Sequence, residues 1–298
     1  MKILVAVDGS SYSRMAIEFV ASRRTLIESN PDLEVLHVRL PLPAIRAQGV
    51  GRELARSYYA EEAEKVLKPA RVRLQKAGLS PKVRFVIGHP ATAIGTTADK
   101  DNVDLLVLGS HGHSALAGML LGSVTNEVLV RTKRAMLIVR GKAKRYPDSL
   151  RVGIAVDGSR HGREAVKYVL RHLDLFGANP KLTLIHVVDD YALTAMASTA
   201  GIAQPVFSES EFRTLQTKAF EGAVGPARAP LKKKVGVAAH EVRLVGNAGD
   251  ELSAYAKKKL DLLVLGSHGY GAFKAVVMGS VATRVTARSR VPLLLVRA

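Results

Sequence analysis

Short apolar runs alternate with longer stretches of helical periodicity along this chain. Runs such as ILVAV at 3–7, LLVLG at 105–109 and LLLVR at 293–297 are nearly continuous, which is typical of parallel strands buried on both faces. Between such runs, residues 52–78 carry apolar positions at helical spacing. That apolar stripe consists of Leu54, Tyr58, Ala63, Val66, Leu67, Ala70 and Leu74.

The same succession of elements occurs twice. KILVAVDGSSYSRMAIEFV at 2–20 returns as RVGIAVDGSRHGREAVKYVL at 151–170, and LEVLHV at 33–38 returns as LTLIHV at 182–187. Each half reads β-α-β-α-β-α-β-α-β, and the period is far too long for a solenoid. The sequence therefore predicts an α/β fold with two tandem Rossmann-like domains, each a five-stranded parallel sheet flanked by helices.

The domain boundaries follow from composition. Residues 1–140 and 150–298 form the two predicted domains, and the polar segment 141–149, which contains a proline, is the predicted linker. The second half is longer between its second and fourth strands. There, Gly225-Pro226 and Pro230 are expected to break or shorten the counterpart of the 52–78 helix, because proline removes a helical hydrogen bond.

Composition narrows the class of protein. The 298 residues are 47% apolar, enough for two ordinary domains, and include no cysteine, which excludes disulfides and thiolate chemistry. No apolar run approaches 18 residues, so no membrane span is expected. The apolar run at the N-terminus is short and is interpreted as a first strand rather than a signal peptide. These features favour a cytoplasmic protein.

The net charge of +18 divides evenly, with +9 in each half. A nucleic-acid-binding arm usually forms a segregated basic block, whereas the densest runs here, Lys232–Lys234 and Lys257–Lys259, are short. The first interpretation is a basic, solvated surface. The alternative is a positive field that attracts polyanions, including nucleotides and, without sequence preference, nucleic acid; nucleic acid is the less favoured partner.

One glycine pattern, G-x2-G-x9-G-S, is repeated with identical spacing 157 residues apart. Its positions are Gly109, Gly112, Gly122 and Ser123 in the first half and Gly266, Gly269, Gly279 and Ser280 in the second. Each copy follows an apolar strand and opens a helical segment. Repetition of the whole set indicates a duplicated nucleotide site, because backbone N–H groups at a helix start suit phosphate.

Three groups should converge beyond the carboxyl ends of the strands, where ligands bind in open α/β sheets. Asp8 and Asp157 follow the first strand of each half and could accept hydrogen bonds from a ribose hydroxyl or an adenine amine. The loop glycines would allow close backbone approach and positive φ. The serine of each Gly-Ser pair could cap the next helix.

Each of these features also has a purely structural interpretation. A glycine at a strand-to-helix turn is often only turn chemistry, an aspartate there is usually a helix N-cap, and the serine could be a cap alone. His111 and His268 occupy the same place in the two loops; they either donate to phosphate or satisfy the local backbone. His37 and His186 lie in the second strands and are expected to be packed residues.

At these residues the chain resembles the universal stress protein family, as a tandem two-domain member. Both copies match the motif G-x2-G-x9-G-[S/T] of the family's nucleotide-binding branch, and VAVDGS, IAVDGS, the second-strand HV and the terminal LIVR and LLVR also look like the family. The resemblance implies domains of the adenine nucleotide alpha hydrolase-like type, with ATP bound in the crevice. Any Mg²⁺ would arrive with the phosphates, and no protein metal site is expected.

Carried over by position, the resemblance implies two sets of nucleotide-binding residues. In the first half they are Ala6, Val7, Asp8, Val38, Gly109, Ser110, His111, Gly112, Gly122, Ser123 and Val124. In the second half they are Ala155, Val156, Asp157, Val187, Gly266, Ser267, His268, Gly269, Gly279, Ser280 and Val281. One departure concerns the turn after Asp157, where Gly162 replaces the serine found at Ser13.

The last strands carry the expected contact between the halves. Single-domain members usually dimerise through the last strand, which would otherwise be an exposed apolar edge. Residues 134–140 and 291–297 are therefore expected to pair within this chain as a pseudo-dimer. A further homodimer is an additional expectation.

The function expected from these observations is that of an ATP-binding stress or regulatory protein. A slow ATP hydrolase or phosphotransferase and a basic polyanion binder are the alternatives. No Ser-His-Asp order, paired carboxylates or metal-ligand cluster is repeated between the halves. No catalytic residue is therefore assigned.

Overall fold

The computed structural model describes residues 1–41, 52–112, 121–141, 146–190, 208–234, 239–267 and 278–297. The strands are β1 Lys2–Val7, β2 Asp32–Arg39, β3 Lys82–Ile87, β4 Leu105–Gly109, β5 Ala135–Val139, β6 Arg151–Ala155, β7 Lys181–Val188, β8 Ala239–Val245, β9 Leu262–Gly266 and β10 Leu293–Val296. They form one ten-stranded sheet in the order β3-β2-β1-β4-β5-β10-β9-β6-β7-β8. Each half contributes five parallel strands, so the predicted α/β class is confirmed.

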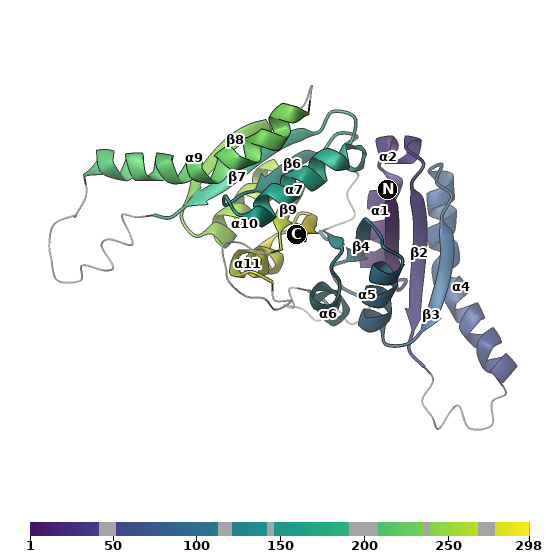
Figure 1. The fold of residues 1–298 in the computed structure, drawn as a ribbon. Coiled ribbons are helices and arrows are strands. Elements are labelled where there is room, and N and C mark those ends of the chain that lie inside the picture. Colours follow the sequence, from purple (N-terminus) through teal and green to yellow (C-terminus); the bar gives the residue numbers. More distant parts are fainter. Residues whose placement is uncertain are drawn as a thin grey trace, which may run out of the picture.

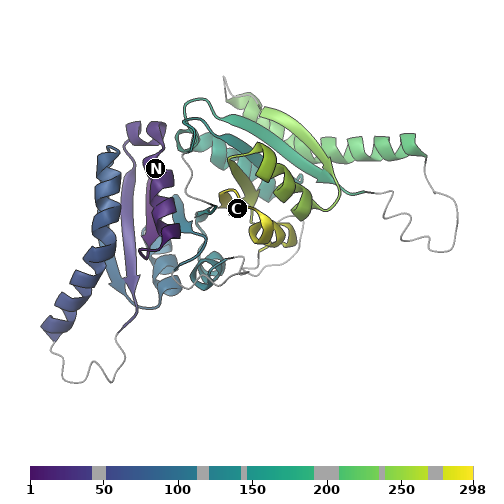
Figure 2. The ribbon, with the colours of Figure 1, turned by 180° about the vertical axis from the view of Figure 1, so that it is seen from behind.

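Helices cover both faces of the sheet. They are α1 Ser11–Ala21, α2 Arg24–Glu28, α4 Arg52–Lys76, α5 Pro90–Lys100, α6 Ser123–Arg131, α7 Arg160–Arg171, α9 Glu209–Lys233, α10 Ala248–Lys259 and α11 Ser280–Arg288, with a 3₁₀ turn, η1, at Leu173–Leu175. Helices α1, α4, α7 and α9 pack on one face, and α5, α6, α10 and α11 pack on the other. Figures 1 and 2 show α4 and α9 at opposite ends of the molecule.

Successive side chains of a strand point to opposite faces of the sheet. The inner strands are buried on both sides because helices cover both faces. In β1, Ile3 and Val5 enter the core beneath α1 and α4, while Leu4 packs on the opposite core. The two edge strands differ from the inner ones. Residues of β3 and β8 are largely half-buried or exposed, since an edge strand has a neighbour on one side only.

Helix α4 begins where the 52–78 stripe predicts it, but only part of that stripe is core. Ala63, Leu67 and Leu74 are buried, whereas Leu54 is 66% exposed and Tyr58 is 41% exposed. The first turns of α4 extend beyond the end of the sheet (Figure 1). The apolar side chains there therefore have no strand beneath them.

The expectation that proline would break the second long helix is wrong. Helix α9 runs for 25 residues with Pro226 and Pro230 inside it, and α4 likewise contains Pro69. In each helix an arginine two residues after a proline bonds a glutamate seven residues earlier, one pair being Arg228 with Glu221 at 2.6 Å. The ion pair spans the turn in which proline removes a backbone hydrogen bond.

The halves join through their last strands. Strands β5 and β10 pair antiparallel, with Met136, Leu137 and Ile138 opposite Leu295, Leu294 and Leu293. The predicted pairing of 134–140 with 291–297 within one chain is therefore confirmed, while association with a second copy stays a prediction. None of the described helices is long and apolar enough to cross a membrane.

The described end of the predicted linker is packed rather than loose. Tyr146 is buried, and its ring lies edge-on to Phe19, 4.8 Å between centroids. The fully buried Arg23 lies against both rings and donates to the carbonyl of Pro147 at 2.9 Å. These contacts fix the described end of the linker against the C-terminal end of α1.

Candidate functional site

The turn after β1 brings Asp8 to the carboxyl edge of the sheet. Asp8 Oδ1 accepts the N–H of Ser10 at 2.9 Å, and Ser10, not Asp8, is the N-cap of α1. Ser10 Oγ accepts the N–H of Ser13 at 3.2 Å. The interpretation of Asp8 as the N-cap is therefore wrong, because serine performs that task and Asp8 shapes the turn before it.

The first glycine of the motif is needed for packing. A Cβ on Gly109 would lie 2.6 Å from the carbonyl carbon of Tyr12, and a Cβ on Gly266 would lie 2.8 Å from Cβ of His161. Neither glycine has a positive φ. The expectation of positive φ is wrong here, since these glycines let the end of β4 or β9 touch the first helix of its own half.

The second and third glycines bring the parts of the loop together. A Cβ on Gly112 would lie 2.6 Å from Oδ2 of Asp8, and a Cβ on Gly122 would lie 3.1 Å from Cα of His111. The N–H of Gly122 donates to the carbonyl of Ser110 at 2.8 Å. Asp8, the 110–112 loop and the start of α6 therefore form one cluster, although the loop begins 102 positions after Asp8 (110 − 8).

Helix α6 begins without a side-chain cap in the described part of the chain. Gly122 is the N-cap, so Ser123 is already the first helical residue, and the expectation that Ser123 caps the helix is wrong. Ser123 is exposed and Val124 is half-buried. The first N–H groups of a helix lack partners within it and carry the positive end of its dipole, so this end suits an anion.

His111 lies between the loop and α1. Its Nδ1 is 3.1 Å from Oγ of Ser110, and its ring centroid is 5.0 Å from that of Tyr12. Ser110 is buried and its N–H donates to the carbonyl of Val139 at 2.8 Å, which ties the loop to β5. Donation from His111 to a phosphate stays a prediction.

The expected adenosine side of the site is formed by the ends of β1 and β2. Ala6 and Val7 are buried, and Val38 is half-buried at the end of β2. His37 is buried, as predicted, and its Nδ1 lies 2.8 Å from the carbonyl oxygen of Val7. Since a carbonyl only accepts, Nδ1 is the donor, and the ring holds the chain just before Asp8.

The second half repeats this geometry where it is described. Asp157 Oδ1 accepts the N–H of Ser159 at 3.0 Å, and Ser159 caps α7 through the N–H of Gly162. The turn is thus kept although Gly162 replaces a serine. The N–H of Gly279 donates to the carbonyl of Ser267 at 3.0 Å, as in the first half.

The remaining predicted residues of the second half divide into three groups. Val156 is buried, and Ala155 and Val187 are half-buried at the ends of β6 and β7. Ser280 and Val281 are exposed in the first turn of α11, whose N-cap is Gly279, so Ser280 is not a cap either. His268 and Gly269 lie outside the described residues.

Sequence reasoning missed Tyr12, which closes the first loop by touching Gly109 and His111. Its counterpart is His161, a different residue type, so the internal repeat gave no signal at this position. It also missed Thr125, whose Oγ1 donates to the carbonyl of Gly109 at 2.9 Å. The described residues include no group of three or more His, Cys, Asp or Glu able to hold a metal ion.

Comparisons with known proteins identify the family and the fold of the chain. The model of the universal stress protein family matches residues 1–140 and 150–297. A universal stress protein of Synechocystis sp. is 30% identical over 139 residues, which cover 47% of this chain and 42% of that relative's own length. One from Mycolicibacterium smegmatis is 26% identical over 306 residues, covering 99% of this chain and 96% of the relative.

A solved structure has the same arrangement along its whole length. The crystal structure of a universal stress protein from Archaeoglobus fulgidus superimposes with a TM-score of 0.67 at 22% identity, covering 99% of this chain and 98% of that one. At this identity the likeness shows the fold. Because the family model matches both halves, the chain belongs to the universal stress protein family and has two tandem domains.

Proposed function

We propose that this chain is an ATP-binding universal stress protein in which the bound adenine nucleotide regulates conformation or partner contacts. The observation that supports this most strongly is the cluster of Asp8, the 110–112 loop and the uncapped start of α6 in the first half. It combines an acceptor for hydroxyl or amine groups with backbone donors for phosphate. A nucleotide carries both kinds of group.

The cluster fits the phosphate part of ATP through the backbone. A side chain at Gly112 would displace the carboxylate of Asp8, and one at Gly122 would press on the backbone of His111, so the glycines let these groups keep their present positions. The N–H groups of Ser123 and Val124 would then face the phosphates. Any Mg²⁺ would be held mainly by the phosphates. A cytoplasmic location and a further homodimer stay predictions.

The test is the nucleotide content of freshly purified, denatured protein, identified by chromatography, followed by titration with ATP and Mg²⁺. Gly122→Val should abolish binding in the first half, because the larger side chain displaces His111, and Gly279→Val should do so in the second. Gly222→Val is the matched control, since Gly222 lies on α9 with no described atom within 4 Å of an added Cβ.

The outcomes separate the alternatives. ATP in the purified protein, lost in the two site variants and kept in the control, supports the proposal. Saturating ATP at about 100 times its Kd should also raise the free energy of unfolding by about 2.7 kcal/mol. Steady conversion to ADP that fails in His111→Ala would favour the hydrolase. No uptake of ATP would contradict the proposal and leave the glycines as packing residues.

A further inference from the structure

Two arginines cross from one half of the molecule to the other. Arg140 follows β5, and its Nη1 donates to the carbonyls of Thr286 at 2.7 Å and Ser289 at 2.9 Å, at the end of α11. Arg297 follows β10, and its Nη2 donates to the carbonyl of Leu129, near the end of α6. Arg140 and Arg297 are equivalent residues of the repeat, and so are the acceptors Thr286 and Leu129. The same contact is therefore made in both directions.

These contacts lie at the negative ends of the two helices that begin at the candidate phosphate sites. The last carbonyls of a helix lack partners within it, and a cation there is stabilising. Arg140 is only 6% exposed. Burial lowers the pKa of Arg297 and lowers that of Arg140 to about 10, so Arg140 stays charged at neutral pH.

Each arginine is also tied to the phosphate loop of its own half. The N–H of Ser110 donates to the carbonyl of Val139, the residue before Arg140, and the N–H of Ser267 donates to the carbonyl of Val296, the residue before Arg297; both distances are 2.8 Å. One continuous set of contacts therefore leads from each loop, through an arginine, to the helix of the other site.

The two crossings have different surroundings. Nε and Nη2 of Arg140 are buried without a hydrogen-bond partner among the described residues. Near Arg297, by contrast, the carboxylate of Asp99 opposes the effect of burial on the arginine's pKa. Asp99 follows the buried Ala98 in α5, and the corresponding residue of α10, after the buried Ala256, is Lys257.

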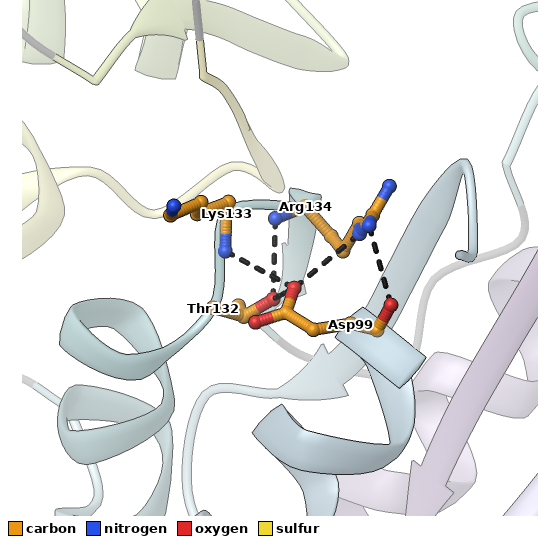
Figure 3. A network of polar contacts seen from close by, with 4 residues as sticks. All are labelled: Asp99, Thr132, Lys133 and Arg134. Carbon is orange, nitrogen blue, oxygen red and sulfur yellow. Dashed lines mark hydrogen bonds and ion pairs between the residues drawn. The ribbon is translucent and has the colours of Figure 1, made fainter. Parts of the chain in front are cut away.

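Asp99 also fixes the turn between α6 and β5 (Figure 3). Its Oδ1 accepts three hydrogen bonds: from the Oγ1 hydroxyl of Thr132 at 2.8 Å, from the N–H of Lys133 at 3.3 Å and from Nε of Arg134 at 3.3 Å. The end of α6 is thus held by its own half as well as by Arg297. The end of α11 is likewise held by its own half, where Arg288 bonds Asp250 of α10, as well as by Arg140.

We propose that Arg140 and Arg297 are positioning residues that complete the nucleotide site of the opposite half. A nine-residue helix is short and stiff, so anchoring its last turn also fixes the direction of its first turn, where the N–H donors face the ligand. Each site is then built from both halves of the chain. This inference rests on the proposed function.

The test is a crossed experiment in full-length protein. Gly279→Val leaves only the first site open, and Gly122→Val leaves only the second. With the first site open, Arg297→Met should weaken ATP binding by about three- to ten-fold while Arg140→Met leaves it unchanged. With the second site open, the pattern should reverse, and isothermal titration calorimetry measures both.

Controls separate positioning from general loss of stability. Arg24→Met removes a charge from α2, where the side chain is 79% exposed, and should change neither site. Arg140→Lys keeps the charge with a different donor geometry and should give an intermediate loss. Three results would overturn the proposal. ATP affinity would fall equally at both sites, fall at the arginine's own site instead of the opposite one, or stay unchanged at both.

A measurement without ligand tests the positioning directly. The N–H of Asn126 donates to the carbonyl of Gly122 at the start of α6, and that of Thr283 donates to Gly279 at the start of α11. Amide hydrogen exchange should speed up at Asn126 in Arg297→Met and at Thr283 in Arg140→Met. If wild-type protein takes up no ATP, the proposed function fails, and this exchange pattern alone decides whether the arginines position the helices. Absence of the crossed pattern would contradict that role.

Discussion

Gly109 lies closer to a neighbouring helix than any side chain could. Its added Cβ would stand 2.6 Å from the carbonyl carbon of Tyr12, which is backbone and cannot turn aside. We therefore expect Gly109→Ala to lower the free energy of unfolding by about 2–3 kcal/mol, the upper range for overpacking. Urea denaturation measures this difference.

The matched control is Gly222→Ala. Gly222 is exposed in the middle of α9, and no described atom lies within 4 Å of an added Cβ. Alanine there should raise the free energy of unfolding by about 0.5–1 kcal/mol, because glycine is a poor helix former. If Gly109→Ala proved as stable as wild type, the conclusion that β4 approaches α1 too closely for a side chain would be contradicted.

At the residue scale, the sequence predicts which residues gather but not what each one does. The repeated spacing indicated that Asp8, Gly112 and Gly122 share a site, and the structure brings them together. Spacing carries no information on collisions, so the dependence of Gly109 on Tyr12 could not be seen. For the same reason Ser123 was expected to be a cap, although the helix begins one residue earlier.

At the element scale, the proline-containing helices are the clearest case for a test. Pro226 cannot donate to the carbonyl of Gly222, and Arg228 bridges the weakened turn by bonding Glu221 and Glu241. Arg228→Met should therefore lower the free energy of unfolding by about 1 kcal/mol, as expected for a partly exposed ion-pair network. Urea denaturation with circular dichroism at 222 nm follows the helix.

The role of the ion pair is tested by a double-mutant cycle. In a Pro226→Ala background the backbone hydrogen bond can form, so Arg228→Met should cost clearly less than it does in wild type. The same cycle with Arg71 and Pro69 is the internal control, because Arg71 bonds Glu64 at 2.6 Å in the equivalent place. Strictly additive effects would show that the ion pair does not compensate for the proline.

Local patterns predicted the strands better than the long helices. Nearly continuous apolar runs identify inner strands because both of their faces are covered. The stripe in α4 correctly indicated a helix, but it could not reveal that Leu54 and Tyr58 project beyond the sheet. The effect of Pro226 was over-weighted because residues seven apart share a helix face, but their spacing alone does not show that Arg228 and Glu221 bond.

At the scale of the whole molecule, the repeat determines how the halves meet. Leu137 and Leu294 are equivalent residues of the two halves and lie directly opposite each other in the antiparallel pair, so the junction has an approximate two-fold axis there. The sequence predicted this pairing from the apolar last strands. It could not predict the crossing arginines, because LIVR and LLVR show a repeated arginine but not where its side chain reaches.

Because the sheet and one core cluster run through both halves, the whole chain should unfold in a single transition.

Leu294 is fully buried at the centre of the junction. Leu294→Asp would bury a charge there, which should cost more than about 4 kcal/mol and separate unfolding into two transitions in differential scanning calorimetry. Leu294→Met, which conserves volume, should cost less than about 1.5 kcal/mol and keep one transition. Two transitions in wild type would mean that the junction adds little to either half, whereas a single, unshifted transition in Leu294→Asp would place the residue outside the core.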